Sequence, residues 1–232
     1  MKLQNTCRPF NMRSSKYCAL LLTLTLLLLP QLVDAHAIDM TGFSRSEVGL
    51  IYLKLGFEHI VPLGLDHILF VLSLFFLSSD LKTVIWQATA FTVAHSITLG
   101  LAMYNVISPP AYIVEPVIAL SIMFVAIENI ISDKLRPSRI IIVFAFGLVH
   151  GLGFAGALSG LGLPENQFVT ALLTFNLGVE LGQITVILFA WFLIAKWFRK
   201  KTWYRTRLVI PISAIIALIA LYWTIERTFF TS

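Results

Sequence analysis

The chain has 232 residues, of which 58% are hydrophobic and only 12% are charged, and its formal net charge is +5. Water-soluble domains carry about 25% charged residues, so this composition excludes a soluble globule. Six spans of about 20 apolar residues would use roughly 120 residues, which leaves no room for a sizeable soluble domain. The positive charges fall in short clusters between apolar runs, as membrane-orientation signals do, and therefore do not predict a nucleic-acid partner.

The first 35 residues have the order of a secretory signal peptide. Basic residues come first, an apolar run follows, and small residues come after it. This order predicts a signal peptide at residues 1–35 that is cleaved after Ala35 or Ala37, with an uncleaved anchor helix as the alternative. The chain's two cysteines, Cys7 and Cys18, lie in this segment. The mature chain would therefore offer no thiolate ligand to a metal.

The rest of the chain predicts an all-α, polytopic membrane helix bundle of six transmembrane helices. Residues 36–60 are too polar to span and are expected to form an extracytoplasmic N-terminal segment. Residues 61–227 are expected to form the transmembrane domain, because apolar segments of spanning length follow one another there. The six predicted spans are 61–79, 83–104, 111–131, 139–160, 168–195 and 208–225.

The basic residues orient this bundle. Removal of a signal peptide leaves the mature N-terminus outside, so the loops after the first, third and fifth spans are expected in the cytoplasm. Those loops and their edges hold ten Lys or Arg residues, Arg139 among them, against three on the outer side, Arg45, Lys54 and Arg227. This asymmetry follows the positive-inside rule. Both ends of the mature chain are therefore predicted to lie outside.

Polar side chains within the apolar spans are the candidate functional residues. An ionised side chain at the centre of a span costs about 2.5–3.5 kcal/mol, whereas one Leu or Ile returns only about 0.3–0.6 kcal/mol. Such residues are therefore expected to face one another and not lipid. The candidate metal ligands are His59, Asp66, His67, His95, His150 and Glu180. The candidate residues of an ion pathway are Glu115, Glu128, Asn129, Asn176 and Gln183.

The predicted topology gives these residues a depth in the bilayer. It puts His59 at the outer mouth and the other five candidate ligands in the central-to-outer part, while Glu128 lies near the inner surface. We therefore expect His67, His95 and His150 to project into one cavity together with the two acidic ligands.

Imidazole and carboxylate ligands without thiolate suit divalent nickel, cobalt, zinc or iron. Two other uses stay open. His95 and His150 lie at similar depth and could ligate a haem in an electron-transfer protein. Three histidines with Asp66 and Glu180 could instead hold a catalytic zinc in an intramembrane hydrolase. A lone histidine in a membrane helix, finally, is commonly an interhelical hydrogen-bond partner.

Several sequence blocks resemble the HupE/UreJ family. The first is a His-rich motif, GFEHIVPLGLDHILF, at residues 56–70. The later blocks are TAFTVAHSITL at 89–99, VEP at 114–116 with EN at 128–129, FGLVHGLGF at 146–154 and FNLGVELGQ at 175–183. They occur in order along almost the whole mature chain, and each contains a polar residue that is expensive to place in a membrane.

The resemblance implies a function and a location. It implies a secondary transporter, and not an enzyme, for nickel or cobalt in the bacterial inner membrane. Zinc stays a further candidate ion because the same ligands suit it. By the same resemblance, His59, Asp66 and His67 would form the entry and binding motif. The expected partners are the metal ion as substrate and the lipid bilayer, and a homo-oligomer is left open.

Overall fold

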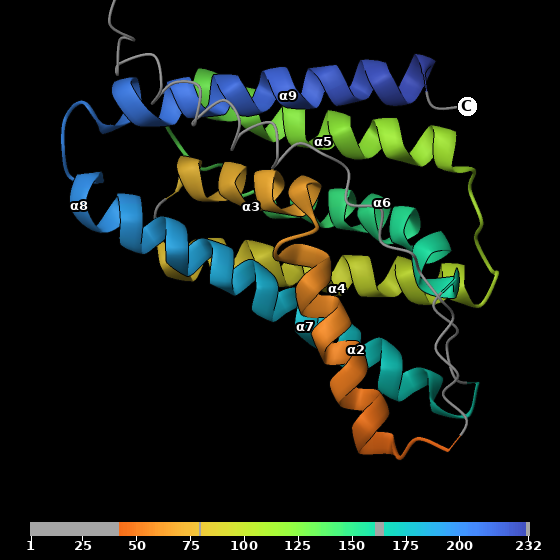
Figure 1. Cartoon of the computed structure of the whole chain (residues 1–232). Coiled ribbons are helices and arrows are strands. Elements are labelled where there is room, and N and C mark those ends of the chain that lie inside the picture. Colours follow the sequence, from red (N-terminus) through yellow and green to blue (C-terminus); the bar gives the residue numbers. More distant parts are fainter. Residues whose placement is uncertain (1–41, 79, 161–164, 231–232) are drawn as a thin grey trace, which may run out of the picture. The chain divides into compact units, whose positions relative to one another are not determined.

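The computed structural model describes residues 42–78, 80–160 and 165–230. The predicted signal peptide and its cleavage sites lie outside these residues. The described part of the chain is helical and contains no strand (Figure 1). The prediction of an all-α fold is therefore confirmed.

The helices follow one another with short connections. The long helices are α2 (Arg45–Ile60), α3 (Leu65–Leu77), α4 (Leu81–Met103), α5 (Ala111–Ile131), α6 (Arg139–Gly160), α7 (Phe168–Ala190) and α9 (Ile210–Phe229). Shorter elements extend α7 and α9, and they are η1 (Glu165–Gln167), η2 (Trp191–Ala195), α8 (Lys196–Phe198) and η3 (Arg205–Val209).

Capping side chains define where two of the helices begin. Ser44 and Glu47 form a capping box at the start of α2, in which each side chain bonds the other residue's backbone N–H. At the start of α4, Asp80 accepts hydrogen bonds from the Thr83 hydroxyl (2.7 Å) and backbone N–H (3.0 Å). These two bonds favour the carboxylate and lower the pKa of Asp80 below its ordinary value.

The first predicted span differs from the structure. Residues 61–79 do not form one spanning helix: only α3 (Leu65–Leu77) lies within them, and it is bent by 67° from α2, which ends at Ile60. The break includes Pro62, which has no backbone N–H to donate and therefore interrupts a helix. With 13 residues, α3 is about 20 Å long, which is shorter than the hydrocarbon core of about 30 Å.

Five helical stretches are long and apolar enough to cross a membrane. They are Leu81–Met103, Ala111–Ile131, Arg139–Gly156, Phe168–Phe198 and Arg205–Phe229. A sixth span results only if the bent pair α2 and α3 counts as one broken span or re-entrant segment. The chain is therefore a multi-pass membrane protein with five such helices among its described residues.

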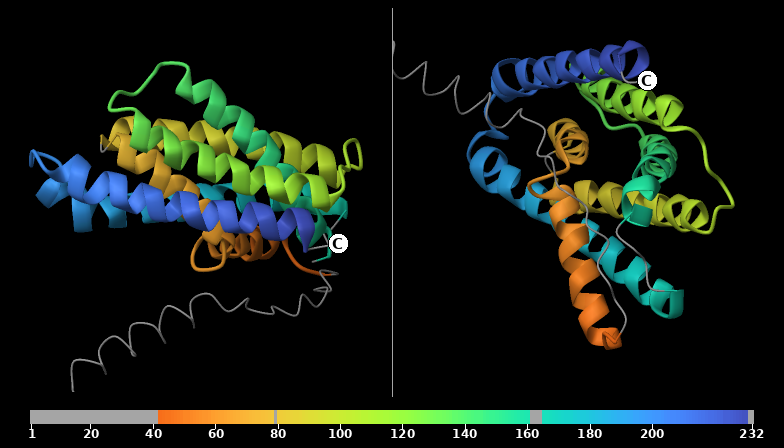
Figure 2. Two further views of the ribbon diagram at one scale, coloured as in Figure 1. Left: turned by 90° about the horizontal axis from the view of Figure 1, so that it is seen from above. Right: turned by 45° about the vertical axis from the view of Figure 1, so that its right-hand side comes forward.

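The helices pack mainly in pairs: α2 with α7, α4 with α6, and α5 with α9. Both the first view and the turned views show these pairs side by side (Figures 1 and 2). Glycines allow two of the close approaches. A Cβ at Gly178 in α7 would collide with the backbone of α2 at Leu53, and a Cβ at Gly151 in α6 would collide with the carbonyl of His95 in α4. The second contact sets α6 directly against the part of α4 that carries a candidate ligand.

Candidate metal-binding centre

Four histidines from four helices form one cluster. His59 lies in the last turn of α2, His67 in the first turn of α3, His95 in α4 and His150 in α6. The ring centroid of His67 is 4.7 Å from that of His59, 5.7 Å from that of His95 and 5.1 Å from that of His150. The rings of His59 and His95 are 6.3 Å apart. The bend between α2 and α3 places the last turn of α2 beside the first turn of α3, so the ring of His59 contacts that of His67.

Most ring nitrogens of this histidine cluster have no partner. His67, His95 and His150 are 6%, 0% and 1% exposed. Within the described part of the chain, five buried nitrogens lack a hydrogen bond: Nε2 of His59, Nε2 of His67, both nitrogens of His95 and Nδ1 of His150. A buried polar atom without a partner costs about 1–3 kcal/mol. Five such atoms at one place therefore favour a binding site over a set of interhelical hydrogen bonds.

One imidazole in the cluster does have a partner. The Nε2 atom of His150 lies 2.9 Å from the Ser121 hydroxyl in α5. Ser121 is itself buried. This contact joins the histidine cluster to α5, and sequence reasoning did not single out Ser121 because a serine in an apolar helix costs little and carries no strong signal.

Aromatic rings enclose the cluster. The ring of His59 lies 3.8 Å from that of Phe154, measured between centroids. Phe91 lies 4.9 Å from His150 and stacks on His95 at 6.1 Å, and Phe70 lies 5.3 Å from His150. These side chains surround the unpartnered nitrogens with apolar surface. They also were not predicted, because phenylalanine is common in every span.

Asp66 is adjacent to His67 but is bound by an arginine. Both of its carboxylate oxygens accept hydrogen bonds from Arg227 in α9, at 2.8 and 3.2 Å. Arg227 also donates to the backbone carbonyl of Glu115, at 3.4 Å. From the sequence, Arg227 was identified only as one of the basic residues predicted on the outer side of the membrane. Its pairing depends on the packing of the last helix near the first helices, which no local pattern predicts.

Glu180 lies in a separate polar contact between α7 and α4. Its Oε1 accepts a hydrogen bond of 2.6 Å from the Thr89 hydroxyl, and three residues further on, Gln183 accepts one of 3.2 Å from Thr92. The amide of Asn176 donates to the carbonyl of Leu172 in its own helix. The structure thus places Glu180 and Gln183 against α4, and the contacts described for Glu180 do not include a ring of the histidine cluster.

Glu128 and Asn129 belong to a second buried polar group, the Arg139 group, which consists of Ser73, Glu128, Asn129 and Arg139. Arg139 is 1% exposed and forms an ion pair of 3.0 Å with Glu128. Asn129 and Arg139 both donate to the carbonyl of Ser73 in α3, at 2.8 and 3.3 Å. Arg139 was predicted as a cytoplasmic loop charge, but it is the first residue of α6 and points inward.

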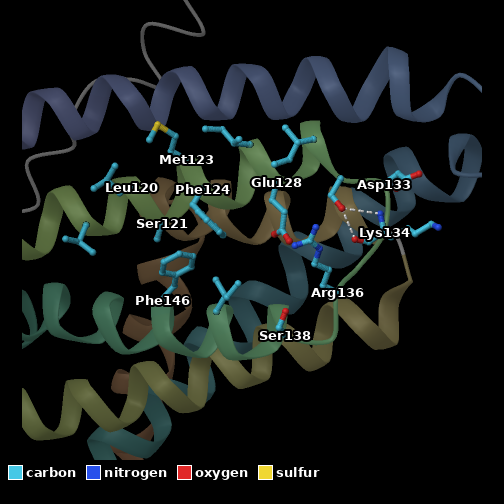
Figure 3. Close-up of a pocket in the computed structure, with 15 residues that line it drawn as sticks. Leu120, Ser121, Met123, Phe124, Glu128, Asp133, Lys134, Arg136, Ser138 and Phe146 are labelled. Atoms are coloured by element: carbon cyan, nitrogen blue, oxygen red, sulfur yellow. Dashed lines mark hydrogen bonds between the residues drawn. The ribbon is translucent and has the colours of Figure 1, made fainter.

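A cavity of about 880 Å³ lies between α5 and α6. Figure 3 shows it with Ser121, Phe124 and Glu128 of α5 on one side and Phe146 of α6 on the other. Ser121 and Glu128 are two helical turns apart on the same face of α5. The cavity runs along α5 from Ser121 past Glu128 to the loop at residues 132–138, and the described residues that line it include no histidine. Its link to the histidine cluster is the hydrogen bond between Ser121 and His150.

The histidine cluster is not arranged as a finished metal site. No group of three or more His, Cys, Asp or Glu residues in the described ranges is placed so that it could hold a metal ion. The rings are close to one another, while Asp66 and Glu180 accept hydrogen bonds elsewhere. Binding of a metal would therefore require rotation of imidazoles toward a common centre.

Comparison with known proteins gives one match. The family model described as HupE / UreJ protein matches residues 35–227. No curated protein and no solved structure matches the chain. The matched range includes all four histidines of the cluster and both arginine–carboxylate pairs. The chain belongs to the HupE/UreJ family.

Proposed function

We propose that this protein is a secondary transporter that carries a divalent transition metal, nickel or cobalt, across the bacterial inner membrane through the histidine cluster. The family is associated with nickel or cobalt transport or with an accessory function. The observation that carries the proposal is the set of five buried, unpartnered imidazole nitrogens contributed by four helices. Neutral imidazole is a ligand that suits nickel, cobalt and zinc.

The charge of the site supports transport over permanent binding. A transported ion must bind strongly enough to leave water and weakly enough to be released. The histidine cluster supplies uncharged ligands, and the neighbouring carboxylate of Asp66 is already neutralised by Arg227. Such a site attracts a divalent ion less strongly than a cage of free carboxylates would.

The cavity between α5 and α6 supports a route for release. It joins Ser121, which contacts His150, to Glu128. In this proposal the ion enters beside His59, binds at the histidine cluster and leaves toward Glu128. Glu128 lies near the end of α5 that leads into the basic loop of residues 132–138. The mature N-terminus outside and the cytoplasmic position of that loop are part of the proposal.

The two other functions are less well supported. Phe91 packs against both His95 and His150, in the space that a haem between the two imidazoles would need. A catalytic zinc with a carboxylate as general base would need a free acid beside the cluster. Asp66 is bound by Arg227, and Glu180, although its Oε2 has no partner, contacts Thr89 of α4 and none of the rings described in the cluster.

The direct test is metal uptake by liposomes that contain the purified full chain. We expect radiolabelled nickel or cobalt to enter these liposomes faster than protein-free ones, and His67→Ala to reduce the uptake to the protein-free rate. Gln87→Ala is the matched control, because Gln87 is also buried, lies in α4 and is outside the histidine cluster. Uptake by the unaltered protein at the protein-free rate would refute the proposed transport.

A further inference from the structure

The ion pair between Asp66 and Arg227 stands directly beside the histidine cluster. We infer that the Arg227 guanidinium is a tethered cation that occupies Asp66 until a divalent metal ion at the histidine cluster displaces it. This inference rests on the proposed function, since it assigns Asp66 as a ligand that becomes available only by exchange. It also assigns Arg227 as a residue that sets the affinity of the site for its ion.

The geometry explains why Asp66 is not ready to bind a metal. Its two oxygens accept from the two terminal nitrogens of Arg227, at 2.8 and 3.2 Å, which is the bidentate geometry that guanidinium and carboxylate favour. Asp66 and His67 are successive residues in the first turn of α3, and successive side chains of a helix point about 100° apart. The Asp66 carboxylate must therefore leave Arg227 and rotate toward the imidazole before both can bind one ion at a shared centre. The bound guanidinium holds the carboxylate away from that centre.

Charge makes the exchange competitive. A divalent ion at the histidine cluster and the fixed positive charge of Arg227 repel each other, and both are attracted to the single negative charge of Asp66. The metal carries twice the charge and gains imidazole ligands at the same time. The arginine can therefore hold Asp66 when no ion is present and lose it when an ion arrives.

Arg227 has other contacts that can hold it after displacement. Its guanidinium lies over the ring of Trp223, 5.3 Å from the centroid, one helical turn earlier in α9. It also donates to the carbonyl of Glu115 in α5. A guanidinium released from Asp66 would keep a cation–π partner and a carbonyl acceptor, so its release does not leave a buried cation without contacts.

The pair also links two helices that otherwise touch little. Helix α9 packs chiefly on α5 and only slightly on α3. The Asp66–Arg227 pair joins α3 to the C-terminal end of α9. Near the other end of α9, Asn129 bonds both Ser73 of α3 and Ser213 of α9, and that link does not involve the histidine cluster. Arrival of the metal would therefore remove the link between α3 and the C-terminal end of α9, while the packing of α9 on α5 and the link at its other end remain.

The test is a metal-binding titration of the purified full chain with nickel, cobalt and zinc. Loss of the competing cation in Arg227→Gln should tighten binding about tenfold, which corresponds to the loss of one charge-assisted bond. Arg227→Lys keeps the charge without the bidentate contact and should give a smaller gain. The matched control is Arg45→Gln, which removes an exposed arginine at the start of α2 and should leave the affinity unchanged.

A double variant shows whether the gain acts through Asp66. Compared with Asp66→Asn alone, Asp66→Asn/Arg227→Gln should bind the metal much less than tenfold more tightly, because the carboxylate for which the two cations compete is gone and only the direct repulsion is relieved. If Arg227→Gln does not fold, Arg227→Lys must still bind more tightly than the unaltered protein. A full tenfold gain in the absence of the Asp66 carboxylate would overturn the inference.

Amide hydrogen exchange distinguishes the inferred cation exchange from a purely structural ion pair, because only the cation exchange predicts that metal alters exchange in α9. Metal should increase amide exchange at residues 224–229 in the unaltered protein but have little further effect in Arg227→Gln. If His67→Ala abolishes binding while Arg227→Gln binds as the unaltered protein does, the proposed function stands and the inference fails. If neither the unaltered protein nor Arg227→Gln binds any of the three ions, both fail.

Discussion

Helix α3 contributes to two buried polar groups, one made of imidazoles and one built on an ion pair. At the first turn, His67 belongs to the histidine cluster, where five ring nitrogens of four residues have no partner. At the other end, the carbonyl of Ser73 accepts from Asn129 and Arg139, and Arg139 pairs with Glu128. In this Arg139 group the ion pair and the Ser73 carbonyl join the helices, although Ser73 Oγ, Asn129 Oδ1 and Arg139 Nε also lack a hydrogen-bond partner. A paired buried charge holds its helices together, whereas unpaired ring nitrogens reduce stability unless a ligand binds them. The comparison therefore separates a structural region from a binding region within one short helix.

The largest expected effect is a loss of fold stability on substitution in the Arg139 group. Arg139→Gln removes the cation from a buried pair and leaves Glu128 without its charge partner, which typically costs about 3–5 kcal/mol. We expect a large drop in the melting temperature of the detergent-solubilised protein. Arg207→Gln removes an exposed arginine and serves as the control. A melting temperature for Arg139→Gln equal to that of the control would break the comparison.

The opposite behaviour is expected in the histidine cluster. His95 has two unpartnered ring nitrogens and stacks on Phe91, so a phenylalanine at this position keeps the ring shape and removes two unsatisfied polar atoms. His95→Phe should abolish metal binding and leave the melting temperature of the metal-free protein unchanged or higher. Calorimetric titration and thermal unfolding of the same sample measure both effects. Undiminished metal binding in this variant would exclude His95 from the site.

A smaller effect should separate binding from release. Glu128→Gln removes the negative charge on the route through the cavity between α5 and α6. It also leaves the buried Arg139 without its charge partner and should lower the melting temperature, so binding and uptake are measured below that temperature. We expect the metal affinity in solution to change little and the liposome uptake rate to fall. If Glu128→Gln and His67→Ala lost binding to the same extent, Glu128 would belong to the binding site and not to the exit.

The smallest effect concerns a helix start outside both regions. Thr83 lowers the pKa of Asp80 by bonding its carboxylate, so this cap stabilises the fold above the ordinary aspartate pKa of about 3.9, and its contribution is lost as the pH falls through the lower folded-state pKa. Asp80→Ala should therefore lower the melting temperature slightly at pH 7 and not at all in strong acid. A difference that grows as the pH falls would contradict this sign.

Composition and spacing predicted much of this fold and part of the site. Apolar runs of spanning length predicted helices close to α4, α5, α6, α7 and α9, because a membrane segment needs length and apolarity and little else. The high cost of intramembrane polar groups selected all four residues of the histidine cluster. The bend at Pro62, between α2 and α3, was not predicted, because a hydropathy average does not reveal a break between two apolar helices.

The partners of the acidic residues could not be predicted. Asp66 and Arg227 are 161 positions apart, and their contact depends on how the last helix packs. Arg139 looked like an orientation signal because it adjoins a basic loop, yet it is buried at the start of α6. Such pairings are set by tertiary packing, and a single sequence without the packed helices contains no local pattern that specifies them.

The central claim is that the histidine cluster binds the metal through imidazole nitrogen. X-ray absorption at the metal edge of the nickel- or cobalt-loaded protein tests it most directly, because imidazole ligands give a distinctive outer-shell scattering. The account predicts a coordination shell that contains several imidazoles and loses imidazole scattering in the His95→Phe variant. A shell of oxygen ligands without imidazole, unchanged by that substitution, would contradict it.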